Sequence, residues 1–378
     1  MKIAFYAPLK PPTSPIPSGD RLIARMFMQA LEKRGYEVFL ASRFRAFDGG
    51  ANEGRQNRLA HLGGQLAARL LRRIRDGAVP RPDLWFTYHL YHKAPDWIGP
   101  VIAGALKIPY VVAEASFAPK QAGGPWKRGH DRVARTLGEA DLVIALNRSD
   151  MACLRPRLAA SERLVRLKPF LDCTPWREGA RQRGPQRERL YREHEIPPGA
   201  PLLLCVAMMR PEGKLCSYRL LARELEKLTD RPWHLLIAGD GPARDAVLNS
   251  FASLTGRITW LGECENSQLA QLCGASDIFV WPAIREAIGM CFLEAQAAGL
   301  PVVGSDGGGV PDVVANGKSG LLATYGDGDD FRNSLGRLLD DAPKRKKMGE
   351  YAARYALREH DLEVAGRQLG QLLEGLRS

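Results

Sequence analysis

The sequence predicts an α/β protein built from two doubly wound domains. Its 378 residues favour two domains over one. Short apolar runs alternate with amphipathic segments of helical period along most of the chain. The alternation breaks near residue 170 and resumes near residue 201. Strands that alternate with helices of this length indicate a parallel sheet with helices on both faces. We therefore expect one such sheet in residues 1–170 and a second in residues 177–355.

In residues 1–170, apolar runs that fit strands are followed by segments that fit helices. The expected strands are, in order, KIAFYAP, YEVFLAS, DLWFTY, PYVVAEAS and DLVIALN. The expected helices are RLIARMFMQALEKRG, residues 55–81, a segment near 96–106, a segment near 129–138, and RSDMACLRPRL. This order predicts a single parallel sheet for the first domain.

A charged segment rich in Gly and Pro, about residues 177–200, reads as a linker with a short helix. The alternation after it gives the expected strands PLLLCVAMM, WHLLIAGD, RITWLGE, DIFVWPA, PVVGSD and GLLATYG, with helices between them. Residues 356–378 form a helical tail. In open α/β sheets ligands bind outside the carboxyl ends of the strands, so two such domains in series predict a cleft lined by strand ends.

The composition narrows the class of protein. Hydrophobic residues make up 45% and charged residues 25%, as in an ordinary globular protein. No run approaches the roughly 20 apolar residues of a membrane-spanning helix. The N-terminal apolar run is short and leads into prolines, which does not fit a signal peptide. The 7 cysteines are scattered without a CxxC pair, which argues against disulfides or a zinc site and predicts a cytoplasmic protein.

The net charge of +12 fits nucleic acid, an anionic membrane surface or a phosphate-bearing substrate. Residues 55–81 form a basic amphipathic helix, with Leu and Ile at helical spacing and arginines around them. This helix predicts either peripheral contact with an anionic membrane or an ordinary solvated helix face with arginine stems along it. We expect no nucleic-acid partner, because no recognition motif accompanies the charge.

Candidate site residues of the first domain follow its strands. Ser18 and Gly19 open a helix that is expected to begin near Arg21, where free backbone N–H groups approach a phosphate. His89 follows LWFTY and Glu114 follows YVVA. The alternative for Ser18–Gly19 is an ordinary loop with a helix N-cap. The alternative for His89 and Glu114 is a purely structural role.

Candidate site residues of the second domain include two cations after a strand, Arg210 and Lys214. An Arg fork and a Lys point charge suit a diphosphate, and a charged loop is the alternative. AGDGPAR lacks the third glycine of a dinucleotide fingerprint, so Gly241 is expected in a turn that lines the cleft. DGDD at residues 327–330 looks like a metal-binding motif but fits a loop with an N-cap better.

Two carboxylates, Glu286 and Glu294, lie eight positions apart in REAIGMCFLEAQAAG. The expected helix begins near Gly289, so Glu286 lies in the loop and Glu294 about one turn into the helix. The N–H groups at Gly289, Met290 and Cys291 would form a positive helix N-terminus for an anion. This layout suits an elongated ligand with hydroxyls at both ends and a phosphate between them, such as a nucleoside diphosphate sugar. The alternative is a helix-terminal Glu and an ordinary helical Glu.

Because of these candidate site residues and their spacing, the chain resembles the retaining GT-B glycosyltransferases of glycosyltransferase family 4. The resemblance covers nearly its whole length. The strongest part is E-x7-E from Glu286 to Glu294, followed by AQAAGLPVVGSDGGGVPDVVANGKSGLL. RPEGK and GDGP support the resemblance. It implies two Rossmann-like domains facing a cleft: an acceptor domain in residues 1–170, a nucleotide-sugar donor domain in residues 177–355, and a C-terminal helix, 356–378, that crosses back to the N-terminal domain.

The resemblance also implies roles for individual residues. Glu286 would contact donor sugar hydroxyls and Glu294 the ribose. Arg210 and Lys214 would bind the diphosphate with the amides of Ile288, Gly289 and Met290, and Ser18–Gly19 would close over the phosphate. The chain departs from the family where Ser18 replaces a glycine, Ile288 replaces a phenylalanine, the Arg and Lys are four rather than five apart, and EAS (114–116) replaces a histidine. Glu114 or His89 would then assist the acceptor.

The expected reaction is transfer of a hexosyl group from an NDP-sugar, with retention, to a glycan, lipid-linked or other hydroxyl acceptor, as in polysaccharide biosynthesis. Arg210, Lys214 and the helix N-terminus would stabilise the departing diphosphate, so neither a metal nor another cofactor is expected. Two other classes remain open: a catalytically silent NDP-sugar-binding protein, and an NDP-sugar epimerase of the same fold. The sequence alone does not specify the nucleotide, sugar, acceptor or linkage.

Overall fold

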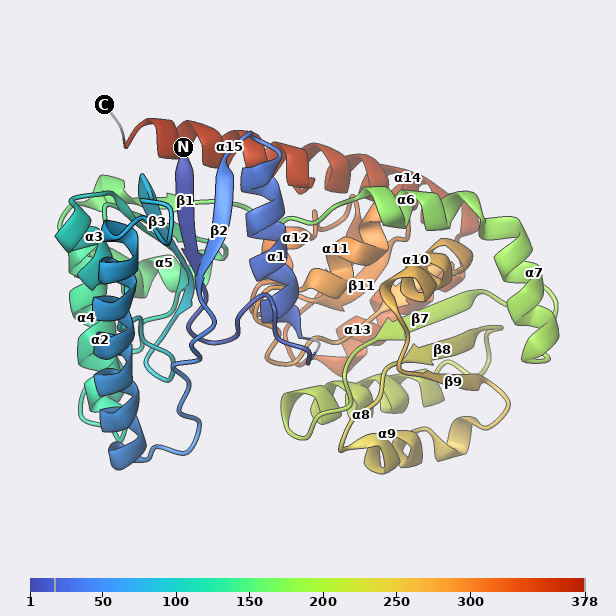
Figure 1. The fold of residues 1–378 in the computed structure, drawn as a ribbon. Helices are drawn as coiled ribbons and strands as arrows, with labels where there is room; N and C mark the ends of the chain where they lie inside the picture. The colour runs from blue at the N-terminus through green and yellow to red at the C-terminus, as the bar shows by residue number, and fades with distance from the viewer. Residues whose placement is uncertain (17, 377–378) are drawn as a thin grey trace. The chain divides into compact units, whose positions relative to one another are not determined.

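The computed structural model describes residues 1–16 and 18–376, which divide into two compact units (Figure 1). The first unit is Met1–Lys168 with the chain from Leu362 onward, and the second is Pro169–Asp361. Each unit contains one six-stranded sheet. All the strand pairs described in the two sheets are parallel. The predicted α/β class with two doubly wound sheets is therefore confirmed.

The first sheet has the strand order β2-β1-β3-β4-β5-β6. Its strands are β1 (Lys2–Tyr6), β2 (Glu37–Ser42), β3 (Leu84–Leu90), β4 (Tyr110–Ala115), β5 (Leu142–Ala145) and β6 (Leu164–Arg166). Its helices are α1 (Gly19–Glu32), α2 (Glu53–Arg75), α3 (Gly99–Leu106), α4 (Lys127–Glu139), α5 (Arg148–Leu154) and α15 (Leu362–Glu374).

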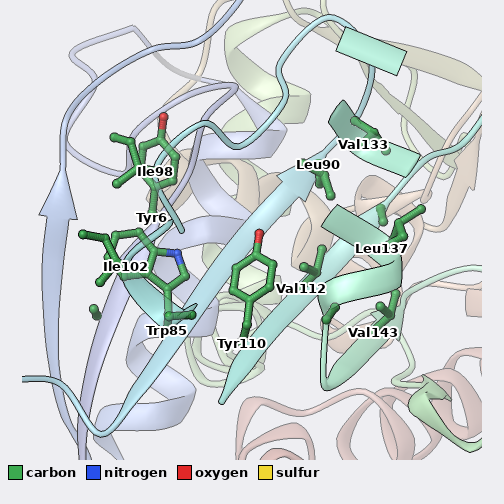
Figure 2. Packing of buried hydrophobic residues seen from close by; sticks show 14 of the residues in the cluster. Tyr6, Trp85, Leu90, Ile98, Ile102, Tyr110, Val112, Val133, Leu137 and Val143 are labelled. Atoms are coloured by element: carbon green, nitrogen blue, oxygen red, sulfur yellow. The ribbon is translucent and has the colours of Figure 1, made fainter. Parts of the chain in front are cut away.

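The core of the first unit lies on both faces of this sheet, because successive side chains of a strand point to opposite sides. On one face, the rings of Phe5 and Phe86 lie 5.6 Å apart, and Phe27 of α1 lies 5.5 Å from Phe86. On the other face, side chains of α2, α3 and α4 form one buried cluster with those of the strands, Trp85 among them (Figure 2). Helices α2, α3 and α4 thus cover the same face of the sheet.

Helix α15 packs against α1 within the first unit. A Cβ atom at Gly366 would lie 3.0 Å from the carbonyl oxygen of Ala30, so the glycine allows close approach. Lys33 Nζ and Glu363 Oε1 lie 2.8 Å apart across the same contact. The predicted return of a C-terminal helix to the N-terminal domain is confirmed. The helix starts later than residue 356, at Leu362, because the helical tail is interrupted at 360–361.

The second sheet has the strand order β12-β11-β10-β7-β8-β9. Its strands are β7 (Leu202–Val206), β8 (His234–Ala238), β9 (Ile258–Gly262), β10 (Ile278–Val280), β11 (Val302–Ser305) and β12 (Gly320–Ala323). Its helices are α6 (Thr174–Arg181), α7 (Arg183–Glu193), α8 (Gly213–Glu226), α9 (Arg244–Ser250), α10 (Asn266–Ala275), α11 (Met290–Ala297), α12 (Val310–Val313), α13 (Gly328–Leu339) and α14 (Ala342–Glu359).

The charged segment expected as a linker with a short helix is instead two helices, α6 and α7, packed on the second unit. A Cβ atom at Gly179 of α6 would lie 2.4 Å from the carbonyl oxygen of Ala270, so the backbones of α6 and α10 meet closely. Arg183 and Arg187 of α7 both pair with Asp277, at 2.7 and 2.8 Å. The composition is misleading here because these arginines make specific ion pairs with the domain rather than remaining solvated.

Helix α2 uses most of its apolar stripe inside the first unit. Leu70 and Ile74 are buried in the core cluster, Leu66 packs against that cluster, and Leu62 remains exposed. This is the packing of a helix that covers a sheet, and it leaves little apolar surface for a bilayer. Membrane contact through residues 55–81 therefore stays a prediction. In residues 1–16 and 18–376, no helix combines the length and the apolarity that crossing a bilayer requires.

Candidate active site

The loop between β10 and α11 carries Glu286 and has a specialised backbone. Ala283 and Arg285 adopt φ values of +58° and +59°, and Gly289, the N-cap of α11, has φ +83°. Positive φ is uncommon for residues other than glycine and concentrates at functional sites. The helix begins at Met290, as predicted, and Glu294 is its fifth residue. Glu286 thus lies on the loop and Glu294 on the helix.

The triple glycine at 307–309 lets a second backbone segment lie directly against the Glu286 loop. A Cβ atom at Gly308, where φ is +60°, would lie 1.9 Å from the carbonyl oxygen of Glu286. One at Gly309 would lie 2.2 Å from the carbonyl oxygen of Ala287. The amide of Gly309 donates to the Glu286 carbonyl at 3.1 Å. The glycines are needed because no side chain fits between these two segments.

Lys214 and Glu286 form an ion pair in which Nζ lies 2.5 Å from Oε2. Their side chains are 29% and 17% exposed, so solvent screens the pair only partly. Lys214 Nζ also lies 5.4 Å from the ring centroid of Trp281, a cation–π contact that restricts the ammonium group further. The second carboxylate oxygen of Glu286 makes no hydrogen bond within the described residues and can accept one from a ligand hydroxyl.

Glu294 and Arg210 both carry charged groups that are unused by the protein. Burial raises the pKa of Glu294 to about 7. Within residues 1–16 and 18–376, the Glu294 carboxyl group has no hydrogen-bond donor, and the exposed guanidinium of Arg210 has no acceptor. Both groups can therefore bind a ligand without first breaking a contact in the protein.

Gly241 belongs to a loop that packs on the segment before Arg210. Cβ atoms at Gly239 and Gly241, where φ is +144° and +152°, would lie 2.0 and 2.4 Å from the carbonyl oxygens of Ala207 and Met209. The amide of Met209 donates to the Asp240 carbonyl at 2.9 Å. The glycines of AGDGPAR thus serve close backbone contact between the loops that follow β7 and β8.

In the first unit, Ser18 is the N-cap of α1, and its side chain accepts from the amide of Arg21 at 3.2 Å. The helix begins at Gly19, slightly earlier than expected. Asp20, in the first turn, was not singled out from the sequence, yet its Oδ1 lies 3.0 Å from His89 Nδ1. The only feature of the sequence that could have pointed to Asp20 is its position as an acidic residue in the first turn of the helix, directly after Ser18–Gly19.

His89 and Glu114 lie inside β3 and β4 near their carboxyl ends; the expected strand DLWFTY ends before His89, whereas PYVVAEAS already includes Glu114. Both have left-handed backbones, with φ of +61° and +55°, which turns their side chains out of the regular strand pattern. Burial alone would lower the pKa of His89, but its hydrogen bond to Asp20 and the charge of Glu114 outweigh burial and raise it. Asp20, His89 and Glu114 therefore interact electrostatically in one cluster.

Glu114 is 7% exposed, and its Oε2 has no hydrogen-bond partner among the residues that the structure describes. Burial raises its pKa to about 7, from 4.5, against the opposing influence of His89. A buried carboxyl group with an unused oxygen and a pKa near neutrality can exchange a proton with a ligand hydroxyl.

The Glu114→Gln variant is expected to gain stability relative to the wild type as the pH rises. Because the folded pKa of Glu114 exceeds the unfolded value, the folded state holds a proton that the unfolded state releases, and the free energy of unfolding falls between about pH 5 and 7. Gln does not titrate, so the variant does not lose this stability. Its free energy of unfolding relative to that of the wild type should rise by up to about 3 kcal/mol at pH 8. Chemical denaturation at pH 5 and 8 measures it. The exposed Glu139→Gln is the control, and a difference independent of pH would contradict the prediction.

The structure supports the capping interpretation of DGDD. Asp327 is the N-cap of α13 and accepts from the amide of Asp330 at 3.0 Å. Among residues 1–16 and 18–376, no group of three or more His, Cys, Asp or Glu side chains is placed to hold a metal ion. Independence of a metal stays a prediction for the activity.

Comparison with known proteins agrees with this architecture. Residues 186–355 match the family described as glycosyl transferases group 1. This segment is similar to that family, and the two parallel six-stranded sheets of the chain have the GT-B fold. The family resemblance predicted from E-x7-E is therefore confirmed.

Among curated relatives, a D-inositol 3-phosphate glycosyltransferase of Nocardia farcinica is 27% identical over 300 residues, which cover 75% of this chain and 65% of the relative. A sulfoquinovosyl transferase of Arabidopsis thaliana is 32% identical over 171 residues, 44% of this chain and 32% of the relative. The chain thus spans less than two thirds of the length of these relatives. The solved Anabaena protein HepE, in complex with UDP and glucose, covers 99% of both chains with a TM-score of 0.72 at 18% identity.

Proposed function

We propose that the protein is a retaining glycosyltransferase that moves a hexosyl group from an NDP-sugar to a hydroxyl acceptor. The observation that carries the proposal is the constellation in the second unit: the Lys214–Glu286 ion pair, the N-terminus of α11 and the unpaired carboxyl group of Glu294. These groups offer a cation, backbone N–H donors and two carboxylates to one elongated ligand. We propose UDP as the nucleotide, since the Anabaena relative in fold was solved with UDP-glucose.

In the proposed reaction, the bond between the anomeric carbon and the diphosphate oxygen breaks, and the acceptor oxygen bonds to the same face of the sugar. The nucleoside diphosphate leaves with the bonding electrons. Arg210, Lys214 and the amides at the start of α11 would stabilise its negative charge, which is where preorganised donors lower a barrier most. A diphosphate oxygen takes the proton of the acceptor hydroxyl.

The ion pair gives Lys214 and Glu286 linked roles. With Oε2 of Glu286 bound to Lys214, Oε1 can accept from a donor sugar hydroxyl. Lys214 in turn is held where it can reach the phosphate. In the first unit, we propose that His89 and Glu114 contact acceptor hydroxyls and that Asp20 orients His89. Ser18 and Gly19 stay candidates for phosphate contact at the N-terminus of α1.

UDP at a hundredfold excess over its dissociation constant is expected to stabilise the wild type by about 2.7 kcal/mol, because a ligand that binds only the folded state shifts the unfolding equilibrium. In Glu294→Ala, the loss of hydrogen bonds between ribose hydroxyls and a carboxylate should cost about 1.5–3 kcal/mol, which weakens binding by about 10- to 150-fold. Thermal unfolding with UDP, GDP, ADP and dTDP sugars measures both effects.

Glu350→Ala is the matched control, since Glu350 is an exposed glutamate on helix α14. An equal UDP effect in Glu294→Ala and Glu350→Ala would contradict the role of Glu294. Stabilisation without transfer of labelled sugar to any acceptor would favour the catalytically silent binding protein. Conversion of one NDP-sugar into another would favour the epimerase. No stabilisation by any nucleotide would overturn the proposed function.

A further inference from the structure

The first unit contains a cavity of about 670 Å³ that none of the candidate site residues lines. Its walls are the first turns of α2, the segment around Trp97 that precedes α3, and helix α4 with the loop before it. These three wall segments follow the carboxyl ends of β2, β3 and β4. Open α/β sheets bind ligands at this edge, and the volume lies within the range of pockets for small molecules.

One face of helix α4 lines this cavity with positive charge. Arg128, Arg132 and Arg135 recur at the spacing that places side chains on the same side of a helix. Within residues 1–16 and 18–376, none of the three guanidinium groups lies within ion-pair distance of a carboxylate. Lys127, also on the wall, pairs with Asp131 at 2.5 Å. In the described part of the chain, the wall thus offers three guanidinium groups without an ion-pair partner.

Trp97 and Arg132 give the cavity a fixed wall. A Cβ atom at Gly63 of α2 would lie 2.3 Å from Trp97 Cβ, so α2 packs directly on the tryptophan. The guanidinium carbons of Arg128 and Arg132 lie 5.9 and 5.8 Å from the Trp97 ring centroid. Arg132 Nε also donates to the Asp96 carbonyl at 2.9 Å. Its buried Nη2 has no hydrogen-bond partner in the described part of the chain, so this guanidinium retains unused donor capacity.

The segment that carries Trp97 is itself anchored by a buried carboxylate. Asp96 accepts from the amides of Ile98 and Gly99 at 2.8 and 2.7 Å, from the Thr87 hydroxyl at 2.6 Å and from the Tyr110 hydroxyl at 3.0 Å. All its partners are neutral, and the cations of α4 are left for other acceptors. Arg132, held by the Asp96 carbonyl and the Trp97 ring before binding, would lose little entropy when an anion arrives, which favours affinity.

We propose that this cavity binds the anionic group of the acceptor, so that the acceptor is a saccharide or polyol bearing a phosphate, sulfate or carboxylate. Planar guanidinium groups bind such oxyanions through paired charge-assisted hydrogen bonds. The remaining volume accommodates the ring that carries the anion. Glu53 and Asp131, the acidic residues on the wall, disfavour a second anionic group beside them. The identification of the ligand as acceptor rests on the proposed function.

The test compares binding of glucose 6-phosphate, glucose and inorganic phosphate by titration calorimetry. Arg128 and Arg135 are exposed, and alanine is a good helix former, so the double variant Arg128→Ala/Arg135→Ala should fold. The control Arg69→Ala/Arg73→Ala removes the same charge from exposed positions of α2 in the same unit. We expect the wild type and the control to bind glucose 6-phosphate equally, the cavity variant at least tenfold more weakly, and glucose without a phosphate to bind weakly to all three.

Equal affinity of the cavity variant and the control for glucose 6-phosphate would overturn the cavity as the anion site. So would failure of the wild type to bind both glucose 6-phosphate and inorganic phosphate. Stabilisation of the wild type by UDP is measured in parallel and decides the proposed function separately. With an active donor sugar, transfer to an anionic acceptor should show a KM raised at least tenfold in the cavity variant. An anion that binds the cavity but neither accepts sugar nor competes with an acceptor would overturn its assignment as acceptor.

Discussion

The Lys214→Ala variant is expected to transfer sugar 10²–10³-fold more slowly than the wild type. The proposed reaction leaves a diphosphate, and removal of one preorganised donor to developing charge typically costs about 2.7–4 kcal/mol in the barrier. Lys214 is preorganised by its 2.5 Å ion pair with Glu286 and by the ring of Trp281. Its loss also leaves Glu286 without its counter-ion beside the donor sugar. The measurement is kcat under saturating donor and acceptor.

Lys347→Ala, which removes an exposed lysine from α14, is the control for the loss of one positive charge. Lys214→Arg keeps the charge and should recover part of the rate. The double variant Lys214→Ala/Glu286→Ala should be less impaired than the product of the two single losses, since each single variant strands a charged partner. A kcat within threefold of the wild type for Lys214→Ala would show that this lysine does not stabilise the leaving diphosphate.

The Gly308→Ala variant is expected to lose donor binding, with a larger loss of stability than an ordinary Gly→Ala change in a turn. The left-handed backbone alone costs a residue with a side chain about 1–2 kcal/mol. At Gly308, the added Cβ would also lie 1.9 Å from the Glu286 carbonyl oxygen, and forced overpacking typically costs a further 1–3 kcal/mol or so. The Glu286 loop must move, and its carboxylate moves with it. UDP-dependent thermal unfolding measures both consequences.

Gly326→Ala separates the cost of a left-handed backbone from the cost of the steric overlap with the Glu286 loop. Gly326 also has a positive φ, +78°, but a Cβ atom there would meet nothing within 4 Å. Gly326→Ala should therefore show the backbone cost alone and keep its response to UDP. If Gly308→Ala responded to UDP as Gly326→Ala does, the close contact with the Glu286 loop would not be what positions the donor site.

The parts of the site that the sequence predicted share one property: their signals are local. The strand, the glycine and the helix start near Glu286 follow one another along the chain, so the loop position of Glu286 and the helical position of Glu294 could be read directly. The N-caps Ser18 and Asp327 are local in the same sense. Capping depends on a side chain and a backbone amide within a single turn.

The predictions that failed depended on contacts between distant segments. Residues 177–200 have the composition of a linker, but their arginines pair with Asp277, about a hundred positions away. The expected strand DLWFTY ends before His89, whereas PYVVAEAS includes Glu114. The structure keeps both in the strands with left-handed backbones, which no propensity predicts.

The sequence by itself determined the two parallel sheets and the carboxylate pair at a helix start, and it indicated the family resemblance. Apolar periodicity specifies which face of each element is buried, and a motif within one loop and one helix carries its own geometry. Only the tertiary structure decided that Asp20 reaches His89, that Gly308 meets Glu286 and that three arginines of α4 share a cavity wall with Trp97. Those contacts depend on strand order and helix packing, which bring together residues whose separation along the chain bears no relation to their distance in space.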